Sequence, residues 1–450
     1  MLTMQRAPRP NTFEHSFNER ERAQMRSKLA PFALVVVAAV GIGLTGCSTG
    51  TDTGGTTKTT TITFGNWRTE DAKLWENDVI PAFEKTHPGI KVVYRATDTN
   101  DYNAAIQSQV DSGTGPDVIM CRPFDVNRAW IDKGYFDDLK SLKSISNFTP
   151  TALAAWQGSN GDPYCVPIAS VLAGFYYNKA IFKELGLTPP TTMAEFTALL
   201  QKIKDNGKYT PLALGSADGW QLAYNVLDSI GPNYWGGEDG RLGLIDGTKK
   251  LTDPQFVASI QAVSDLKPFL PKGYQSLKYE DMMQLFTLGK AAILPDGSWD
   301  VTAATATGLD VGAFAPPVVN AGDQRYLQEM PDQGVGLNSK SKNKAASKVF
   351  LDWLGTTDFQ QVYVNKVPGF FSMGTTPVTY DNKLAQDFAD LKKGAKLTPR
   401  LALDRLSAGK PPLDDDTWAV LQTVFNDGVT PAAASAKLQK DLDSWYKPTK

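Results

Sequence analysis

The chain has 450 residues, of which 46 are basic and 48 acidic, and its formal net charge is −2. This balance, with no basic stripe along the chain, excludes the classes of protein that bind nucleic acid through a positive surface. The two histidines, His15 and His87, are too few for a zinc site or a Ser-His-Asp triad, because both place histidine within a cluster of functional groups. We therefore expect no cofactor and no metal.

The N-terminal region has the order of charged and apolar residues that is typical of a secretory signal peptide. Basic residues at Arg22, Arg26 and Lys28 precede the apolar run 29–44, which is shorter than the ~20 residues of a membrane-spanning helix. The run ends in Leu44-Thr45-Gly46-Cys47, which resembles the bacterial lipobox. That resemblance implies that Cys47 is lipidated, becomes the mature N-terminus and anchors the protein to a membrane by its acyl chains.

A transmembrane anchor with a chance cysteine is the alternative interpretation of this run. Glycines at 41, 43 and 46 and the polar residues that follow argue against it. Residues 1–24 are polar, and a compact signal begins at Met25, which we interpret as the true start. We assign 1–46 to the signal peptide and 47–61 to the lipidated cysteine and a Thr/Gly-rich flexible tether.

The first part of the mature chain predicts alternating strands and helices. Apolar periodicity gives strand, helix, strand, helix and strand, in the order 61–64, 69–84, 90–94, 102–112 and 117–120. This order implies a parallel sheet with right-handed crossovers. Ligands of such sheets meet the loops at the carboxyl ends of the strands, which here are 65–68 and 121–125.

A long segment of extended character, 166–179, follows and suits a strand that crosses from one lobe to another. Helical spacing dominates the rest of the chain, at 193–206, 221–230, 255–266, 279–287, 345–354 and 418–426. Apart from Cys47, the cysteines are Cys121 and Cys165. Two thiols in an oxidising compartment can form a disulfide, and they can equally be two buried free cysteines.

Several segments together resemble one known family. They are 82–92, 115–119, Tyr176-Tyr177-Asn178-Lys179, and the most specific one, 286–293 with Gly297-Ser298-Trp299. In this order, the chain from residue 62 to the C-terminus resembles the extracellular solute-binding proteins of ABC importers. The resemblance is to the carbohydrate-binding group that includes maltose-binding protein.

The resemblance implies an α/β, two-lobe periplasmic-binding-protein-like fold, with hinge-linked lobes that close around solute in a cleft. We expect lobe 1 to comprise 62–168 with 334–378, and lobe 2 to comprise 169–333 with 379–450. The implied partners are a carbohydrate ligand, the permease subunits of an ABC transporter, and the membrane through the lipid anchor. We expect a monomer without enzymatic activity, outside the cytoplasm and lipid-anchored to the bacterial cell membrane.

Sugar sites combine flat aromatic surfaces with hydrogen-bonding side chains. The resemblance and the position after the first strand suggest four aromatic candidates, Trp67, Trp220, Trp299 and Trp418. Core packing is the alternative for each of them. By contrast, Trp75 and Trp353 fall on apolar helix faces, which predicts core positions.

Polar candidates follow the first and third strands. They are Glu70 and Asp71 after the first strand, and Arg122 and Asp125 after the third. Charged groups form strong hydrogen bonds to hydroxyls. The alternative is that these residues are solvated helix starts, where carboxylates interact favourably with the helix dipole.

Two rival functions remain at this stage. The same scaffold can carry non-sugar cargo such as a peptide or a polyol phosphate, and a secreted glycoside hydrolase would need a pair of carboxylates across its cleft. Maltose binders carry a hinge glutamate where this chain has Val171. That departure puts maltose itself in doubt, though not the carbohydrate class.

The lipobox leads to a prediction about anchoring. A Cys47→Ser variant lacks the sulfur that would carry the lipid, so it should move from the membrane fraction to the soluble fraction. Fractionation followed by a high-salt wash measures this shift. A variant that stays in the washed membranes contradicts the lipoprotein interpretation.

Overall fold

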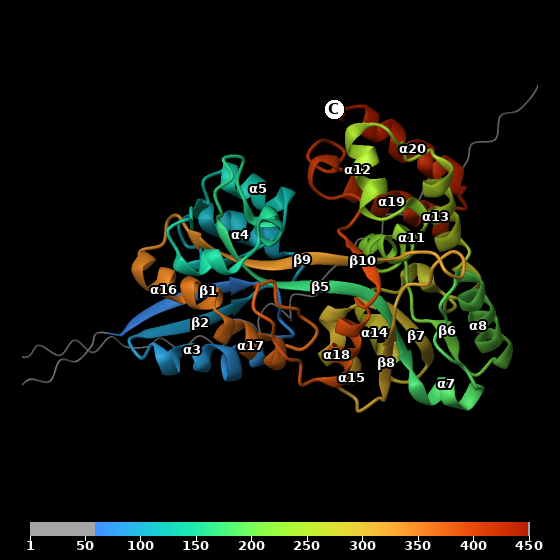
Figure 1. The fold of residues 1–450 in the computed structure, drawn as a ribbon, viewed down its shortest axis with the longest axis horizontal. Coiled ribbons are helices and arrows are strands. Elements are labelled where there is room, and N and C mark those ends of the chain that lie inside the picture. The colour runs from blue at the N-terminus through green and yellow to red at the C-terminus, as the bar shows by residue number, and fades with distance from the viewer. Residues whose placement is uncertain (1–58, 449–450) are drawn as a thin grey trace, which may run out of the picture. The chain divides into compact units, whose positions relative to one another are not determined.

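A computed structural model describes residues 59–448, so the predicted signal peptide, Cys47 and the tether up to residue 58 lie outside the described part (Figure 1). The described chain has a mixed α/β fold with ten strands in one sheet. These strands are β1 (Thr60–Asn66), β2 (Ile90–Ala96), β3 (Val118–Cys121), β4 (Phe136–Asp137), β5 (Cys165–Asn178), β6 (Thr210–Leu212), β7 (Ala291–Gly297), β8 (Val311–Phe314), β9 (Arg325–Asn338) and β10 (Ala395–Thr398).

The main strand order is β2-β1-β3-β9-β5-β7-β6. As predicted, β1 pairs in parallel with both β2 and β3. The carboxyl ends of β1 and β3 therefore lie at the same edge of the sheet, and the loops that follow them are neighbours.

Two long strands connect the halves of the sheet. β5 and β9 lie side by side and antiparallel, from the pair Cys165–Gly336 to the pair Leu172–Glu329 (Figure 1). The register shifts around Ala169, where the pairing is irregular. The predicted crossing strand, 166–179, thus corresponds to β5.

The buried apolar side chains form two hydrophobic cores. The first core contains residues from 62–171 and 330–370 together with Leu403, and the second contains residues from 172–327 and 371–442. β5 leaves the first core at Val171 and enters the second at Leu172. The lobe boundaries given above stay a prediction.

The principal helices of the first core region are α3 (Ile80–Thr86), α4 (Tyr102–Asp111), α5 (Asp125–Asp132), α16 (Lys344–Leu354) and α17 (Thr357–Lys366). Those of the second are α7 (Lys179–Leu185), α8 (Met193–Asn206), α11 (Pro232–Trp235), α12 (Glu238–Asp246), α13 (Pro254–Ser264), α14 (Tyr279–Thr287), α18 (Lys383–Asp390), α19 (Leu413–Asn426) and α20 (Pro431–Asp443). α8 has the predicted bounds because Thr192 and Glu195 form a capping box at its start. No helix of the described chain is long and apolar enough to cross a membrane.

Three predicted helices differ from the structure. The segment 69–84 contains a π-helical stretch, Trp75–Val79, between α2 (Ala72–Leu74) and α3. The segment 221–230 is not one α-helix, because a π-helical stretch, Leu222–Leu227, separates two single turns. The helix expected to begin at Trp418 begins at Leu413 instead. Three aspartates, 414 to 416, occupy its first turn, where their negative charges interact favourably with the positive end of the helix dipole.

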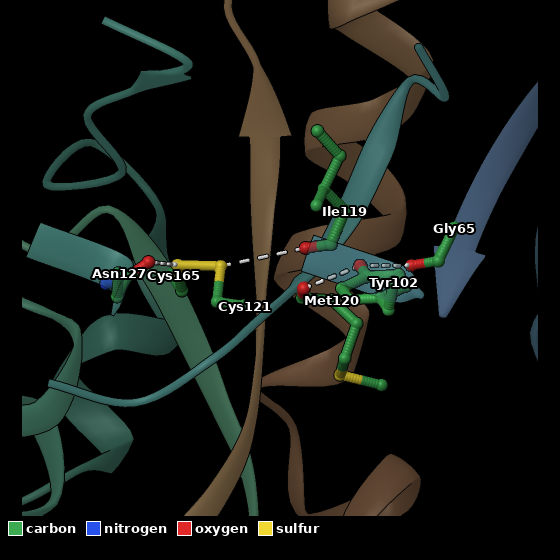
Figure 2. Close-up of a disulfide and its surroundings, with 7 residues drawn as sticks. All are labelled: Gly65, Tyr102, Ile119, Met120, Cys121, Asn127 and Cys165. Carbon is green, nitrogen blue, oxygen red and sulfur yellow. Dashed lines mark hydrogen bonds between the residues drawn. A yellow bond between two sulfur atoms is a disulfide. The ribbon is translucent and has the colours of Figure 1, made fainter. Parts of the chain in front are cut away.

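A disulfide joins Cys121 to Cys165 and settles the alternative left open by the sequence (Figure 2). The two residues meet because β3 and β5 flank β9, where Cys121 pairs with Gly334 and Cys165 pairs with Gly336. A Cβ at Gly336 would lie 3.0 Å from Cys121 Sγ, so glycine leaves the space that the disulfide occupies.

Tyr102 fixes the end of β3 beside the disulfide. Its hydroxyl lies 2.7 Å from the carbonyl oxygen of Met120 and 3.3 Å from that of Gly65, at the end of β1 (Figure 2). The sulfur of Cys165 lies 3.3 Å from Asn127 Oδ1, which is a contact and not a hydrogen bond, because a disulfide sulfur carries no proton. The loop that begins at Arg122 therefore starts from a rigid point.

We predict that a Cys121→Ala/Cys165→Ala double variant is less stable by about 2–4 kcal/mol, because the disulfide closes a long loop in the unfolded chain. The two cysteines are 44 residues apart in sequence. Urea unfolding of the oxidised protein and the variant measures the difference, and reductant should destabilise only the former. Equal midpoints would mean that the bond contributes nothing to stability.

Candidate functional site

A cavity of about 580 Å³ opens at the carboxyl ends of β1 and β3. This volume falls within the range of about 300–1,000 Å³ that is usual for small-molecule sites. Its walls come from the loops after those two strands, from the middle of β9, from the segments around Trp220 and Tyr279, and from the C-terminal segment 400–418.

Aromatic side chains form much of the wall. They are Trp67, Trp220, Tyr224, Tyr279, Trp299 and Trp418. Trp220 packs against Tyr279 with ring centroids 5.0 Å apart, and Tyr224 meets Trp418 edge-to-face at 5.4 Å. Except for Trp67, these side chains are only partly buried, so they can present apolar surface to a ligand.

Trp67 is a special case among them. It is 4% exposed, belongs to the first hydrophobic core and packs against Tyr102. The guanidinium of Arg122 lies over its ring at 4.0 Å. Arg122 therefore covers Trp67 by a cation–π contact, so Trp67 supports Arg122 more than it offers a platform of its own.

Arg122 donates its hydrogen bonds to protein groups. Its Nε donates to Asn103 Oδ1 at 3.2 Å, and its Nη2 donates to the carbonyl oxygen of Thr99 at 2.9 Å. Burial lowers the pKa of Arg122 from its ordinary value, and nearby Asp332 opposes that effect. The guanidinium is thus held in place at the cavity wall.

Arg68 links the loop after β1 to the turn after β7 at the site. Its Nε pairs with Asp71, its Nη2 lies 3.1 Å from Glu70 Oε1, and the same nitrogen donates to the carbonyl oxygen of Trp299 at 3.3 Å. Burial alone would lower the pKa of Arg68, but Asp71 and Glu70 raise it above its ordinary value. Trp299 in turn donates from Nε1 to the hydroxyl of Tyr279 at 3.0 Å.

Four carboxylates of the cavity wall have raised pKa values because they are buried, namely Asp125, Asp332, Asp414 and Asp415. Burial, reinforced by Asp404, raises the pKa of Asp125 to about 7, although Arg128 opposes the shift. Burial raises the pKa of Asp414 to about 6, and this carboxylate accepts a hydrogen bond from the hydroxyl of Tyr224. Burial likewise raises the pKa of Asp332 on β9.

The charged groups of the wall are mainly acidic. Three arginines line the cavity, at 68, 122 and 400, against five carboxylates, at 70, 125, 332, 414 and 415. Among residues 59–448 no cluster of three or more His, Cys, Asp or Glu side chains is arranged to hold a metal ion. With its aromatic surface, this wall suits a polar, uncharged molecule with apolar faces.

The structure brings seven of the eight predicted site residues to this one cavity. They are Trp67, Glu70, Arg122, Asp125, Trp220, Trp299 and Trp418. Asp71 is the exception, because it is 3% exposed, pairs with Arg68 and does not line the cavity. Trp75 and Trp353 are buried in the first core, which confirms their predicted core positions.

The sequence predictions missed other lining residues, among them Tyr224, Tyr279, Asp332, Arg400 and Asp414. Asp414 stands four residues before Trp418 in the first turn of α19, and this helical spacing was a usable signal. Asp332 and Arg400 belong to no local sequence pattern. Asp332 lies on β9 and Arg400 follows β10, and the pairing of β9 with β5 and β10 brings both to the site.

The profile of the family described as bacterial extracellular solute-binding protein matches residues 66–361. The chain belongs to this family. An ABC transporter extracellular-binding protein of uncharacterised ligand from Pyrococcus horikoshii is 30% identical over 87% of this chain and 90% of its own length. The melibiose/raffinose/stachyose-binding protein of Bacillus subtilis is 29% identical over 90% and 93% of the two chains.

A solved structure of a chitin oligosaccharide binding protein superimposes with a TM-score of 0.72. It is 23% identical and covers 86% of this chain and 99% of its own. The chain therefore has the two-lobe α/β fold of the periplasmic sugar-binding proteins. Like these relatives, the solute-binding protein described here binds solute and is not an enzyme, which removes the hydrolase alternative.

Asp296 leads to a prediction about pH. It ends β7, is fully buried, and its Oδ1 accepts hydrogen bonds from Asn225 Nδ2 at 3.1 Å and from the Gly297 N–H at 2.8 Å. Burial raises its pKa to about 8 despite these bonds. Because the folded pKa exceeds the unfolded one, protonation stabilises the fold, and this contribution is lost as pH rises from about 4 to about 8.

An Asp296→Asn variant keeps the shape and removes the titration. It should therefore melt at a higher temperature than the wild type at pH 8, with a smaller difference at pH 5. Thermal unfolding of both proteins across this range measures the effect. A variant whose melting temperature runs parallel to that of the wild type at every pH would show that folding does not shift the pKa of Asp296.

Proposed function

We propose that this solute-binding protein captures an oligosaccharide or disaccharide in the cavity and delivers it to the permease of an ABC importer. The observation that carries the proposal is the wall itself, where six aromatic and eight charged side chains line a cavity of about 580 Å³. A sugar presents C–H faces that pack on such rings and hydroxyl edges that bond to such side chains. The names of the sugar-binding relatives support the same ligand class.

A phosphorylated polyol is the rival cargo, and the charges of the wall argue against it. Arg68 is already paired with Asp71 and Glu70, and Arg122 donates to Asn103 and Thr99. Arg400 is then the one arginine of this wall that donates to no acceptor among residues 59–448, whereas a phosphate favours several converging donors. Five carboxylates face the same space and would repel a phosphate. A neutral ligand avoids that repulsion.

Lipid anchoring through Cys47, the two lobes with the boundaries given above, and hinge closure are parts of the same proposal. Closure requires that the ligand bind the closed form better than the open one, so residues from both cores must contact it. The cavity meets this requirement, since Trp67 belongs to the first core and Trp418 packs against the second. Small-angle scattering should show a smaller radius of gyration with saturating ligand than without.

Titration calorimetry with raffinose, stachyose, maltotriose and sn-glycerol 3-phosphate tests the ligand class. We expect heat of binding from at least one of the oligosaccharides and none from the phosphate. Thermal unfolding gives an independent reading, because ligand at 100 times its Kd should stabilise the protein by about 2.7 kcal/mol. Binding of the phosphate alone would overturn the proposal.

The aromatic platforms lead to a prediction with a matched control. Trp299→Ala and Trp418→Ala should each weaken sugar binding by roughly 1–3 kcal/mol, because each removes partly exposed ring surface from the wall. Their apo melting temperatures should stay close to that of the wild type. Trp75→Ala, in the first core, should instead cost about 3–5 kcal/mol of folding stability.

Calorimetry and apo melting of the three variants separate these expectations. A large fall in apo melting temperature for Trp299→Ala or Trp418→Ala, like that of Trp75→Ala, would show that these residues act as core and not as platforms.

A further inference from the structure

Arg400 is a buried arginine in the cavity wall whose backbone is firmly held. It follows β10, is 7% exposed and lines the cavity. The next residue, Leu401, donates its N–H to Asp228 Oδ1 at 3.1 Å, and both Leu401 and Ala402 are buried in the second core. The side chain of Arg400 therefore starts from a fixed position.

The guanidinium of Arg400 stacks on an aromatic ring and leaves its donors unused. Its Cζ lies 3.5 Å from the ring centroid of Tyr224. Its Nε is buried without a hydrogen-bond partner, and no side chain or carbonyl among residues 59–448 accepts a hydrogen bond from the group. Arg68 and Arg122, the other arginines of the wall, both donate to protein acceptors.

Three neighbouring carboxylates, Asp228, Asp332 and Asp414, attract the charge of Arg400 but accept no hydrogen bond from it. Asp414 accepts from the hydroxyl of Tyr224, and Asp228 accepts from the Leu401 N–H. A buried N–H without an acceptor is unfavourable, so the Nε of Arg400 retains an unmet requirement for an oxygen atom at this point of the wall.

We propose that Arg400 is a specificity-determining residue that donates paired hydrogen bonds to two adjacent hydroxyl oxygens of a neutral sugar in the cavity. This inference rests on the proposed function and deepens it. The planar fork of a guanidinium matches two oxygens held at a fixed spacing, as on neighbouring carbons of a sugar ring. Tyr224 also contacts Trp418, so one ring positions both this fork and an aromatic platform.

A sugar acid is the competing ligand chemistry, because its carboxylate would also match the fork. The wall disfavours it, since five carboxylates line the same cavity. Hydroxyls can instead accept from Arg400 and donate to these carboxylates at the same time.

The experiment compares Arg400→Met, Arg400→Lys and a control, Arg405→Met. Arg405 is exposed, lies on the same segment and does not line the cavity. Calorimetry uses raffinose, stachyose and maltotriose as neutral probes and trigalacturonic acid as the acidic one. We expect Arg400→Met to lose roughly 10- to 100-fold in affinity for the neutral sugar that the wild type binds best. Arg400→Lys should fall in between, and Arg405→Met should equal the wild type.

The apo melting temperature separates a ligand-binding role of Arg400 from a structural one, because a structural role would make the variant without ligand clearly less stable. The substitution removes a buried N–H without an acceptor, which offsets the lost attraction to Asp228, Asp332 and Asp414, so apo Arg400→Met should melt close to the wild type. A large fall in apo melting temperature, or unchanged affinity, overturns the inference. Tightest binding of trigalacturonic acid, lost in Arg400→Met, overturns the assignment to a neutral sugar.

The two proposals fail in different ways. A wild-type protein that binds none of the four probes contradicts the proposed function, and the inference about Arg400 falls with it. A wild-type protein that binds a neutral sugar, with Arg400→Met binding it equally well, contradicts only the inference.

Discussion

The buried ion pair between Arg68 and Asp71 is the interaction on which the geometry of the site depends. Arg68 follows the end of β1, and the same guanidinium reaches the carbonyl oxygen of Trp299 in the turn after β7. Removing Arg68 would leave the Asp71 carboxylate buried without compensation, which typically costs about 3–5 kcal/mol. Arg68 thus joins the end of a strand in the first core to an aromatic residue that follows a strand of the second.

From Trp299 the network continues through side chains that face the cavity. Its indole N–H donates to Tyr279, whose hydroxyl donates to Asp300. Burial raises the pKa of Asp300 to about 7, and Arg68 opposes that shift. A substitution at Arg68 would therefore alter the position of Tyr279, which is linked to it through Trp299. Through these contacts Arg68 and Trp299, which are far apart in sequence, hold the aromatic side chains of this wall in place.

Local sequence patterns predicted the elements and brought most candidate residues to the cavity. The predictions that failed depend on contacts that form only in the folded protein. The order of β1 to β3, the crossing strand β5 and the bounds of α8 follow from apolar period and capping, which are local properties. Residues directly after strand ends, such as Trp67 and Arg122, could be placed at the cavity because parallel strands end at one edge. Asp71 shares that position, yet its carboxylate turns to Arg68, and no pattern in the sequence shows a pairing of this kind.

Arg400 and Asp332 were missed because no local sequence pattern points to them. Their positions depend on the pairing of β10 and of β5 with β9, and this pairing is non-local. The same holds for the disulfide, because the spacing of Cys121 and Cys165 does not reveal that their strands flank β9. Residues that tertiary pairing alone brings to a site have no signature in a single sequence.

The segment after β10 adds a constraint on any motion between the two cores. Leu401 and Ala402 are buried in the second core, but Leu403 belongs to the first. Asp404 follows with a φ of 60°, a left-handed conformation that is uncommon outside glycine but that aspartate adopts more readily than most residues. Arg128 of α5 donates to its carboxylate at 2.7 Å. A rotation of one core against the other, as capture in a closing cleft requires, must therefore act on this ion pair and on Leu403 as well as on β5 and β9.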